Sequence, residues 1–117
     1  MTSLRVMIVE DEPLIAMAMQ MLVEDEGGEP LGPHATVAPA VAMVESGEAI
    51  DAALLDCNLG KESSWPIADA LVARGIPFAF TSGQGPKDIA ERFARRPVFA
   101  KPVDEEKLKR FLRQFAR

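Results

Sequence analysis

The chain has 117 residues, of which 48% are hydrophobic and 26% are charged, and these proportions predict one globular domain covering residues 1–117. Its formal net charge of −5 argues against non-specific binding of nucleic acid. No apolar run approaches the roughly 18 residues of a membrane span. The single cysteine, Cys57, excludes a disulfide framework and a zinc cluster. These features predict a cytoplasmic protein that binds neither membrane nor nucleic acid.

Short apolar runs alternate with helical patterns along the chain, which predicts βαβ units around a parallel sheet. Pro13 and Pro66 suit the first turns of two helices, which Gly27 and Gly75 are expected to end. Thr36 is a suitable N-cap for a third helix. Five strands and five helices predict a three-layer α/β fold. In chain order we expect strand 4–9, a helix from residue 13, weak edge strand 29–33, helix 37–45, strand 51–56, polar loop 58–65, helix 66–75, strand 76–82, turn 83–86, short polar helix 87–95, strand 98–100 and helix 104–116.

Charged and hydroxyl side chains stand where four of the five expected strands end. Glu10 and Asp11 follow the first strand, and Asp56 ends the third. Ser82 ends the fourth strand, and Lys101 follows the fifth. Parallel strands bring their carboxyl ends to one edge of the sheet, where ligands bind. We therefore expect these five side chains to meet in one pocket.

The chemistry of such a pocket is that of phosphoryl transfer. Its three carboxylates repel one another unless a cation compensates their charge, and carboxylate oxygens favour Mg²⁺, which also accepts phosphate oxygens. Asp56, at the tip of a buried strand, is placed to attack phosphorus and form an acyl phosphate. Lys101 would present positive charge, and Ser82 a hydroxyl, to the transferring group.

Four short motifs carry a resemblance to a known family. They are Val9-Glu10-Asp11, Leu54-Leu55-Asp56, Thr81-Ser82-Gly83 and Lys101-Pro102. With these motifs the chain resembles the response-regulator receiver domain of two-component signalling from Leu4 to Phe115. The resemblance implies a flavodoxin-like, doubly wound parallel sheet with strand order 2-1-3-4-5.

The same resemblance implies roles for the charged residues of the pocket. Asp56 is then the phosphoacceptor, and Lys101 contacts its phosphoryl group. Glu10 and Asp11 would bind Mg²⁺ together with Asp56 and the backbone carbonyl of Asn58.

The end of the fourth strand offers two hydroxyls, and side chains alternate along a strand, so only one of them faces the pocket. The switch hydroxyl of the family precedes a small residue, which favours Ser82 over Thr81 because Gly83 follows it. Residues 77–85 are also similar to the Pro-Phe-x-Phe-Ala-Thr-Gly-Tyr signature of a subgroup of stand-alone receivers. Gln84 stands where that subgroup usually has Tyr or Gly.

One position departs from the pattern of many receivers. These carry an aromatic switch residue three positions before the lysine, but Val98 occupies that position here. Phe99 is adjacent and is expected to point to the opposite face of the sheet. We expect the turn at 83–86 and the polar helix after it to carry the conformational change instead.

The resemblance implies a single-domain response regulator that receives a phosphoryl group from a histidine kinase or phosphotransfer protein. Its output would pass through protein contacts with a downstream regulatory protein, from a monomer or weak homodimer. Both a phosphate sink and an allosteric messenger fit this reading. It is not expected to be an enzyme that turns over an external metabolite.

Two alternatives belong to other functional classes. A magnesium-dependent aspartyl-phosphate phosphatase commonly has a general acid two residues after its nucleophile, but here that residue is Asn58, which cannot transfer protons. A degenerate receiver that acts as a constitutive interaction module would not need an intact acidic pocket.

Basic residues gather at the end of the chain. Residues 87–117 hold ten of the thirteen Lys and Arg, whereas residues 1–86 hold thirteen of the eighteen acidic residues. The simple interpretation is a solvated basic face on the last helix. The alternative is a docking surface for an acidic partner protein, formed by the fourth helix, the fifth strand and the last helix, with Lys109 and Arg113 as its test positions.

Overall fold

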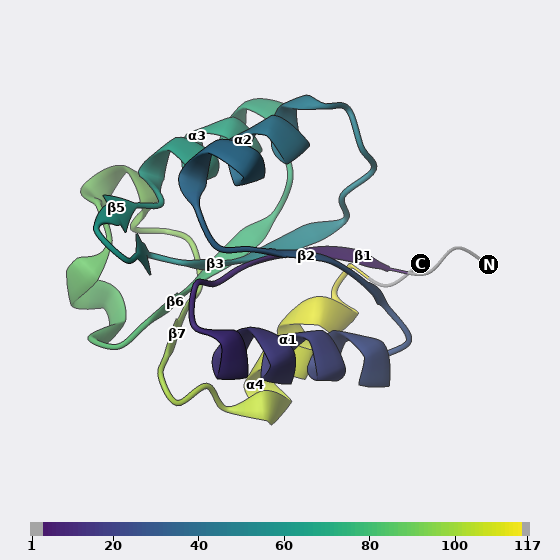
Figure 1. Cartoon of the computed structure of the whole chain (residues 1–117). Coiled ribbons are helices and arrows are strands. Elements are labelled where there is room, and N and C mark those ends of the chain that lie inside the picture. The colour runs from purple at the N-terminus through teal and green to yellow at the C-terminus, as the bar shows by residue number, and fades with distance from the viewer. Residues whose placement is uncertain (1–3, 116–117) are drawn as a thin grey trace.

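The computed structural model describes residues 4–115. Five parallel strands form the central sheet in the order β2-β1-β3-β6-β7 (Figure 1). Counted along the chain within this sheet, the order is 2-1-3-4-5, so the predicted flavodoxin-like topology is confirmed. The strands of the sheet are β1 Arg5–Val9, β2 Glu29–His34, β3 Ala52–Asp56, β6 Phe78–Ser82 and β7 Val98–Ala100.

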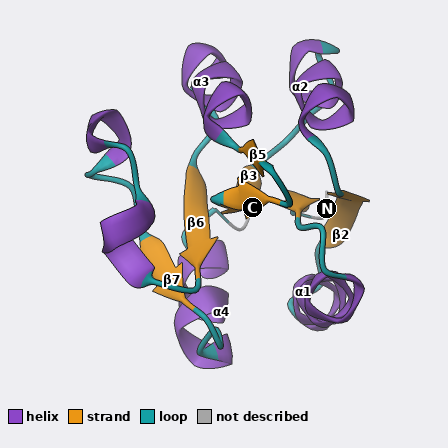
Figure 2. Ribbon diagram, turned by 60° about the vertical axis from the view of Figure 1, so that its left-hand side comes forward, coloured by secondary structure: helices purple, strands orange, loops and turns teal. Residues whose placement is uncertain are grey.

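Four α-helices cover the sheet, two on each face (Figure 2). Helices α2 and α3 lie on one face, and α1 and α4 lie on the other (Figure 1). The predicted three-layer architecture is therefore present. The helices are α1 Pro13–Asp25, α2 Val37–Glu45, α3 Trp65–Arg74 and α4 Glu105–Arg113.

Each face of the sheet has its own hydrophobic core, because neighbouring side chains of a strand point in opposite directions. In β3, Ala53 and Leu55 join the core beneath α2 and α3, whereas Leu54 joins the core beneath α1 and α4. Every residue of β3 is buried, as in a strand covered on both faces. This central strand holds its last residue, Asp56, in a rigid position.

The prediction of a fourth helix, at residues 87–95, is wrong. This part of the chain instead contains two short 3-10 segments, η1 Gly85–Asp88 and η2 Glu91–Phe93. Ile89 and Ala90 have extended backbone angles, with ψ of 129° and 141°, and therefore separate the two segments. This extended break lets both Ile89 and the buried Phe93 pack on the core beneath α2 and α3.

The polar loop expected at 58–65 also contains regular structure. Strands β4 Asn58–Leu59 and β5 Glu62–Ser63 form a small antiparallel hairpin. Leu59 is buried in the core, and Gly60 adopts a left-handed conformation with φ of 62°, which glycine accepts without strain. The hairpin therefore arises from one buried leucine and one glycine turn.

The ends of the other elements agree with expectation to within a few residues. The last helix ends at Arg113, before the predicted end at residue 116, which lies outside the described residues. Thr36 does precede α2 as its N-cap, but its side chain accepts no hydrogen bond there. Within residues 4–115, no helix is both long enough and apolar enough to cross a membrane.

Candidate functional site

The carboxyl edge of the sheet gathers the charged residues that the sequence separates. Glu10 and Asp11 follow β1, Asp56 is the last residue of β3, and Lys101 follows β7. Oxygen atoms of Glu10, Asp11 and Asp56 lie within 4.8 Å of one another. Lys101 Nζ lies 2.9 Å from Asp56 Oδ2 and 3.2 Å from Glu10 Oε1. The four side chains thus form one cluster.

Burial makes this cluster electrostatically demanding. Glu10 and Asp56 are 2% and 5% exposed, whereas Asp11 is open to solvent. Burial raises the pKa of Glu10 to about 7, and the hydrogen bond and charge of Asp56 act in the same direction. The backbone N–H of Glu12, which donates to Glu10 Oε2 over 3.1 Å, opposes this rise.

Lys101 compensates only part of the negative charge. Burial lowers its pKa, but the hydrogen bond and charge of Asp56, followed by the charge of Glu10, outweigh burial and leave the pKa raised. Lys101 is therefore an ammonium ion paired with two of the three carboxylates, those of Asp56 and Glu10. Among the described residues, the buried Glu10 Oε1 accepts no hydrogen bond. In that part of the chain, this oxygen has only the Lys101 ammonium, at 3.2 Å, as its ion-pair partner. A cluster of carboxylate oxygens with excess negative charge fits a divalent cation such as Mg²⁺.

Asn58 lies beside this cluster, but its side chain contacts Cys57 rather than the carboxylates. Its backbone N–H donates to Asp56 Oδ1 over 3.2 Å, and its amide nitrogen lies 3.4 Å from Cys57 Sγ. The expectation for this residue concerns its backbone carbonyl, and that role stays a prediction.

Both hydroxyls at the end of β6 are fully buried, but their surroundings differ. Thr81 pairs in register with Asp56, and its Oγ1 has no hydrogen-bond partner in the described part of the chain. Ser82 Oγ donates to Asp88 Oδ2 over 2.9 Å and accepts from the backbone N–H of Gln84 over 3.1 Å. The preference for Ser82 as the switch hydroxyl stays a prediction.

Asp88 was not expected at this site. Sequence reasoning placed it on a polar helix after residue 86, where its side chain would be one of many solvated charges. The 3-10 turn of η1 instead brings its carboxylate back onto Ser82. The only sequence signal was an acidic residue soon after the Gly85-Pro86 turn.

No protein-family model and no curated protein matches this sequence. Solved structures do match, along nearly its full length. SdrG from Sphingomonas melonis Fr1 shares 44% identity with a TM-score of 0.84, and the match covers 98% of both chains. The BeF3-activated conformation of SdrG from Pseudomonas melonis Fr1 shares 46% identity with a TM-score of 0.77, over 97% of both chains. The chain belongs to the response-regulator receiver family.

More distant receivers share the fold. The PhyR response regulator REC domain of Erythrobacter litoralis is 29% identical with a TM-score of 0.81, over 96% of this chain and 88% of that one. The receiver domain of sensor histidine kinase PA1611 from Pseudomonas aeruginosa is 21% identical with a TM-score of 0.82, over 97% and 98%. That domain has a magnesium ion coordinated in its active-site cleft.

A cluster of aromatic rings lies in the core beside Val98, which occupies the position of the aromatic switch residue of many receivers. Val98 packs against the core beneath α2 and α3. In that core the Trp65 ring lies 5.5 Å from Phe80 and 5.6 Å from Phe93, measured between centroids. Phe99 packs instead on Phe111 in the opposite core, 5.9 Å away, so its predicted orientation is confirmed.

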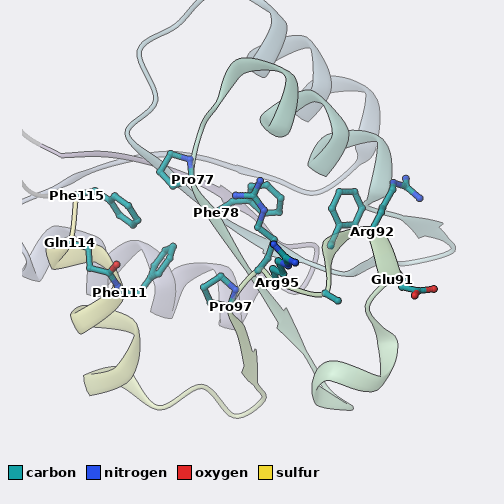
Figure 3. A pocket seen from close by; sticks show the side chains of 12 residues that line it. Pro77, Phe78, Glu91, Arg92, Arg95, Pro97, Phe111, Gln114 and Phe115 are labelled. Carbon is teal, nitrogen blue, oxygen red and sulfur yellow. The ribbon is translucent and has the colours of Figure 1, made fainter.

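A cavity of about 650 Å³ lies at the other end of β6 and β7 (Figure 3). Residues 91–97 form one side, and Phe111 of α4 and Phe115, which follows that helix, face it from the other. Phe78 lies between them, with the Arg96 guanidinium 4.5 Å from its ring centroid. The cavity combines aromatic walls with a cationic rim and is separate from the acidic cluster.

Proposed function

We propose that this receiver is a single-domain response regulator that accepts a phosphoryl group on Asp56. The donor would be a phosphohistidine of a histidine kinase or of a phosphotransfer protein. The observation that supports this most directly is the Lys101 Nζ bond to Asp56 Oδ2 at 2.9 Å, beside two further carboxylates. Such an arrangement holds a reactive carboxylate next to positive charge that can also contact a phosphoryl oxygen.

In the proposed transfer, an Asp56 oxygen forms a bond to phosphorus while the bond from phosphorus to the donor imidazole nitrogen breaks. That nitrogen keeps the electron pair, and the imidazole leaves neutral because the other ring nitrogen of the donor carries a proton. Lys101 then pairs with the phosphoryl group, and Ser82 donates its hydroxyl to it. Glu10, Asp11, Asp56 and the Asn58 carbonyl would hold Mg²⁺, which supplies further positive charge to the phosphoryl oxygens.

Acetyl phosphate with Mg²⁺ tests the acceptor directly. Intact mass spectrometry should find one phosphoryl adduct, peptide mapping should locate it on Asp56, and Asp56→Asn should show none. Asp25→Asn is the matched control, because Asp25 is an exposed aspartate at the end of α1. An adduct that persists in Asp56→Asn, or no adduct at all, would contradict the proposal.

The same variants separate this function from its alternatives. Beryllofluoride with Mg²⁺ should change the amide NMR spectrum of the wild type and leave that of Asp56→Asn unchanged. If neither spectrum changed, a constitutive interaction module would be favoured. Sustained turnover of a small phosphomonoester would favour the phosphatase, although Asn58 offers no general acid.

For output, we propose that a downstream protein inserts an acidic segment with one large apolar side chain into the cavity of Figure 3. The predicted test position Arg113 is already bound to Glu26, at 2.8 Å. Arg92 is likewise bound to Asp69. Within the described residues, Arg95 and Arg96 form no ion pair, so their charge remains for a carboxylate partner.

A probe peptide with the sequence Glu-Asp-Phe-Glu-Asp, blocked at both ends, tests this surface. We expect amide shift changes around the cavity that disappear in Arg95→Glu/Arg96→Glu. They should persist in Lys87→Glu/Lys107→Glu, which makes the same change of charge at exposed lysines elsewhere. Shifts that spread over other surfaces, or that survive the arginine reversal, would rule out the assignment.

A further inference from the structure

The buried hydroxyl of Ser82 is hydrogen-bonded to Asp88, whose carboxylate lies outside the acidic cluster of Glu10, Asp11 and Asp56. Ser82 Oγ donates to Asp88 Oδ2 over 2.9 Å, and Ser82 itself is 0% exposed. The backbone N–H of Gln84 donates to the same Oγ, so the hydroxyl is fixed from both sides. Asp88 is half-buried at the end of η1.

A serine hydroxyl carries a single proton, so it can donate to one acceptor at a time. Ser82 is the neighbour of Thr81, which pairs with Asp56, and its carbonyl accepts from the backbone N–H of Lys101 over 2.9 Å. It therefore lies between the strand that ends with the phosphoacceptor Asp56 and the strand that Lys101 follows. In this conformation the Ser82 hydroxyl donates its hydrogen bond to Asp88.

We propose that Asp88 is a positioning residue that competes with the phosphoryl group for the Ser82 proton and so holds the receiver in its unphosphorylated conformation. The inference rests on the proposed function of Asp56. A carboxylate accepts a stronger hydrogen bond than a neutral group does. Asp88 therefore opposes rotation of the Ser82 hydroxyl toward a phosphoryl group on Asp56.

Release of this hydrogen bond would act directly on the segment that contains Asp88. Segment η1 packs against β6 and β7, and the Ser82 bond is a side-chain link between its last residue and the site. Val98 provides no aromatic ring to transmit a movement of the hydroxyl. The structure thus offers a path from the hydroxyl to η1 that uses one hydrogen bond.

The test is a double-mutant cycle read by beryllofluoride affinity in the presence of Mg²⁺. Asp88→Ala removes the competing acceptor and should bind beryllofluoride about 5- to 30-fold more tightly than the wild type, from a charged hydrogen bond of roughly 1–2 kcal/mol. Asp88→Asn keeps the side-chain shape but not the charge and should give a smaller gain. Lys87→Ala, at the exposed neighbouring residue, should leave the affinity unchanged.

The gain must depend on the hydroxyl if the inference holds. Ser82→Ala and Ser82→Ala/Asp88→Ala should therefore bind beryllofluoride equally. In the protein without Mg²⁺, Asp88→Ala should also shift the Gln84 amide signal, because Gln84 donates to the released Oγ. Asp88→Asn replaces Asp88→Ala if the alanine variant does not fold.

The possible negative results separate the role of Asp88 from the proposed function. Equal affinities of the wild type and Asp88→Ala, or a gain that survives in Ser82→Ala, would overturn the role of Asp88 while the proposed function stands. A wild type that responds to beryllofluoride no more than Asp56→Asn would overturn both.

Discussion

Glu10 is the residue whose environment depends most on a bound cation. Its carboxylate is buried, it faces Asp56 and Lys101, and one of its oxygens accepts no hydrogen bond from the described residues. Burial and Asp56 raise its pKa to about 7. A divalent ion would supply the missing positive charge, so we expect Glu10 to bind metal rather than to transfer protons.

Replacing this carboxylate tests the assignment. Glu10→Gln keeps the size of the side chain but removes a charged oxygen ligand, and we expect the Mg²⁺ dissociation constant to rise by about tenfold or more. Titration calorimetry measures the change. Glu12→Gln is the matched control, because the Glu12 side chain is exposed and lies outside the cluster. Equal losses in both variants would mean that only the net charge matters.

His34 offers a separate test at the edge of the sheet. Its Nε2 lies 3.0 Å from Met43 Sδ, and burial lowers its pKa below the ordinary value. As the pH falls through about 6.5, the unfolded chain therefore binds its proton before the folded one does, and the free energy of unfolding decreases. In urea titrations, the free energy of unfolding of the wild type should decrease more between about pH 7.5 and about pH 5.5 than that of His34→Gln. Parallel curves would contradict this prediction.

The sequence predicted the charged residues of the site better than the hydroxyl region. Glu10, Asp11, Asp56 and Lys101 could be brought together on paper because each stands at the end of an apolar strand, and parallel strands end at one edge. Asp88 could not, because its position depends on a 3-10 turn rather than on a periodic pattern. Its carboxylate reaches Ser82 because of a local backbone turn, which the polar sequence pattern does not predict.

At the scale of the elements, expectation followed the strength of the hydrophobic pattern. The strands at β1, β3 and β6 are continuous apolar runs, and α1 has an apolar stripe bounded by proline and glycine. Residues 85–97 have neither signal. Extended Ile89 and Ala90 interrupt any helix there, because the packing of Ile89 and Phe93 on the core outweighs the local preference of a polar segment.

Two helix starts provide a matched pair for the energetics of capping. The Asp104 side chain accepts from the backbone N–H groups of Glu106 and Lys107, at 3.0 and 3.2 Å. The Thr36 side chain accepts no such bond at the start of α2. We therefore expect Asp104→Ala to lower the free energy of unfolding by about 1 kcal/mol and Thr36→Ala by clearly less. Urea midpoints at constant m measure both, and equal losses would show that cap position matters more than the bond.

At the scale of the whole molecule, the site depends on the complete fold. The acidic cluster consists of residues that follow β1 and end β3, and the lysine beside it follows β7. No short segment contains all of them. An unfolded chain separates these groups and offers no equivalent site, so a bound ion must favour the folded state.

This linkage gives a prediction for the stability of the whole domain. Mg²⁺ at about 100 times its dissociation constant should raise the free energy of unfolding by about 2.7 kcal/mol. Asp11→Asn removes an exposed ligand without opening the core and should abolish most of this rise. Without Mg²⁺, the same variant should be as stable as the wild type or more stable, because one of three mutually repelling carboxylates is gone. The measurement is urea unfolding with and without MgCl₂ at matched ionic strength. A rise of the same size in Asp11→Asn would assign the effect to general screening of the acidic surface. It would contradict Mg²⁺ binding at the acidic cluster as the source of the added stability.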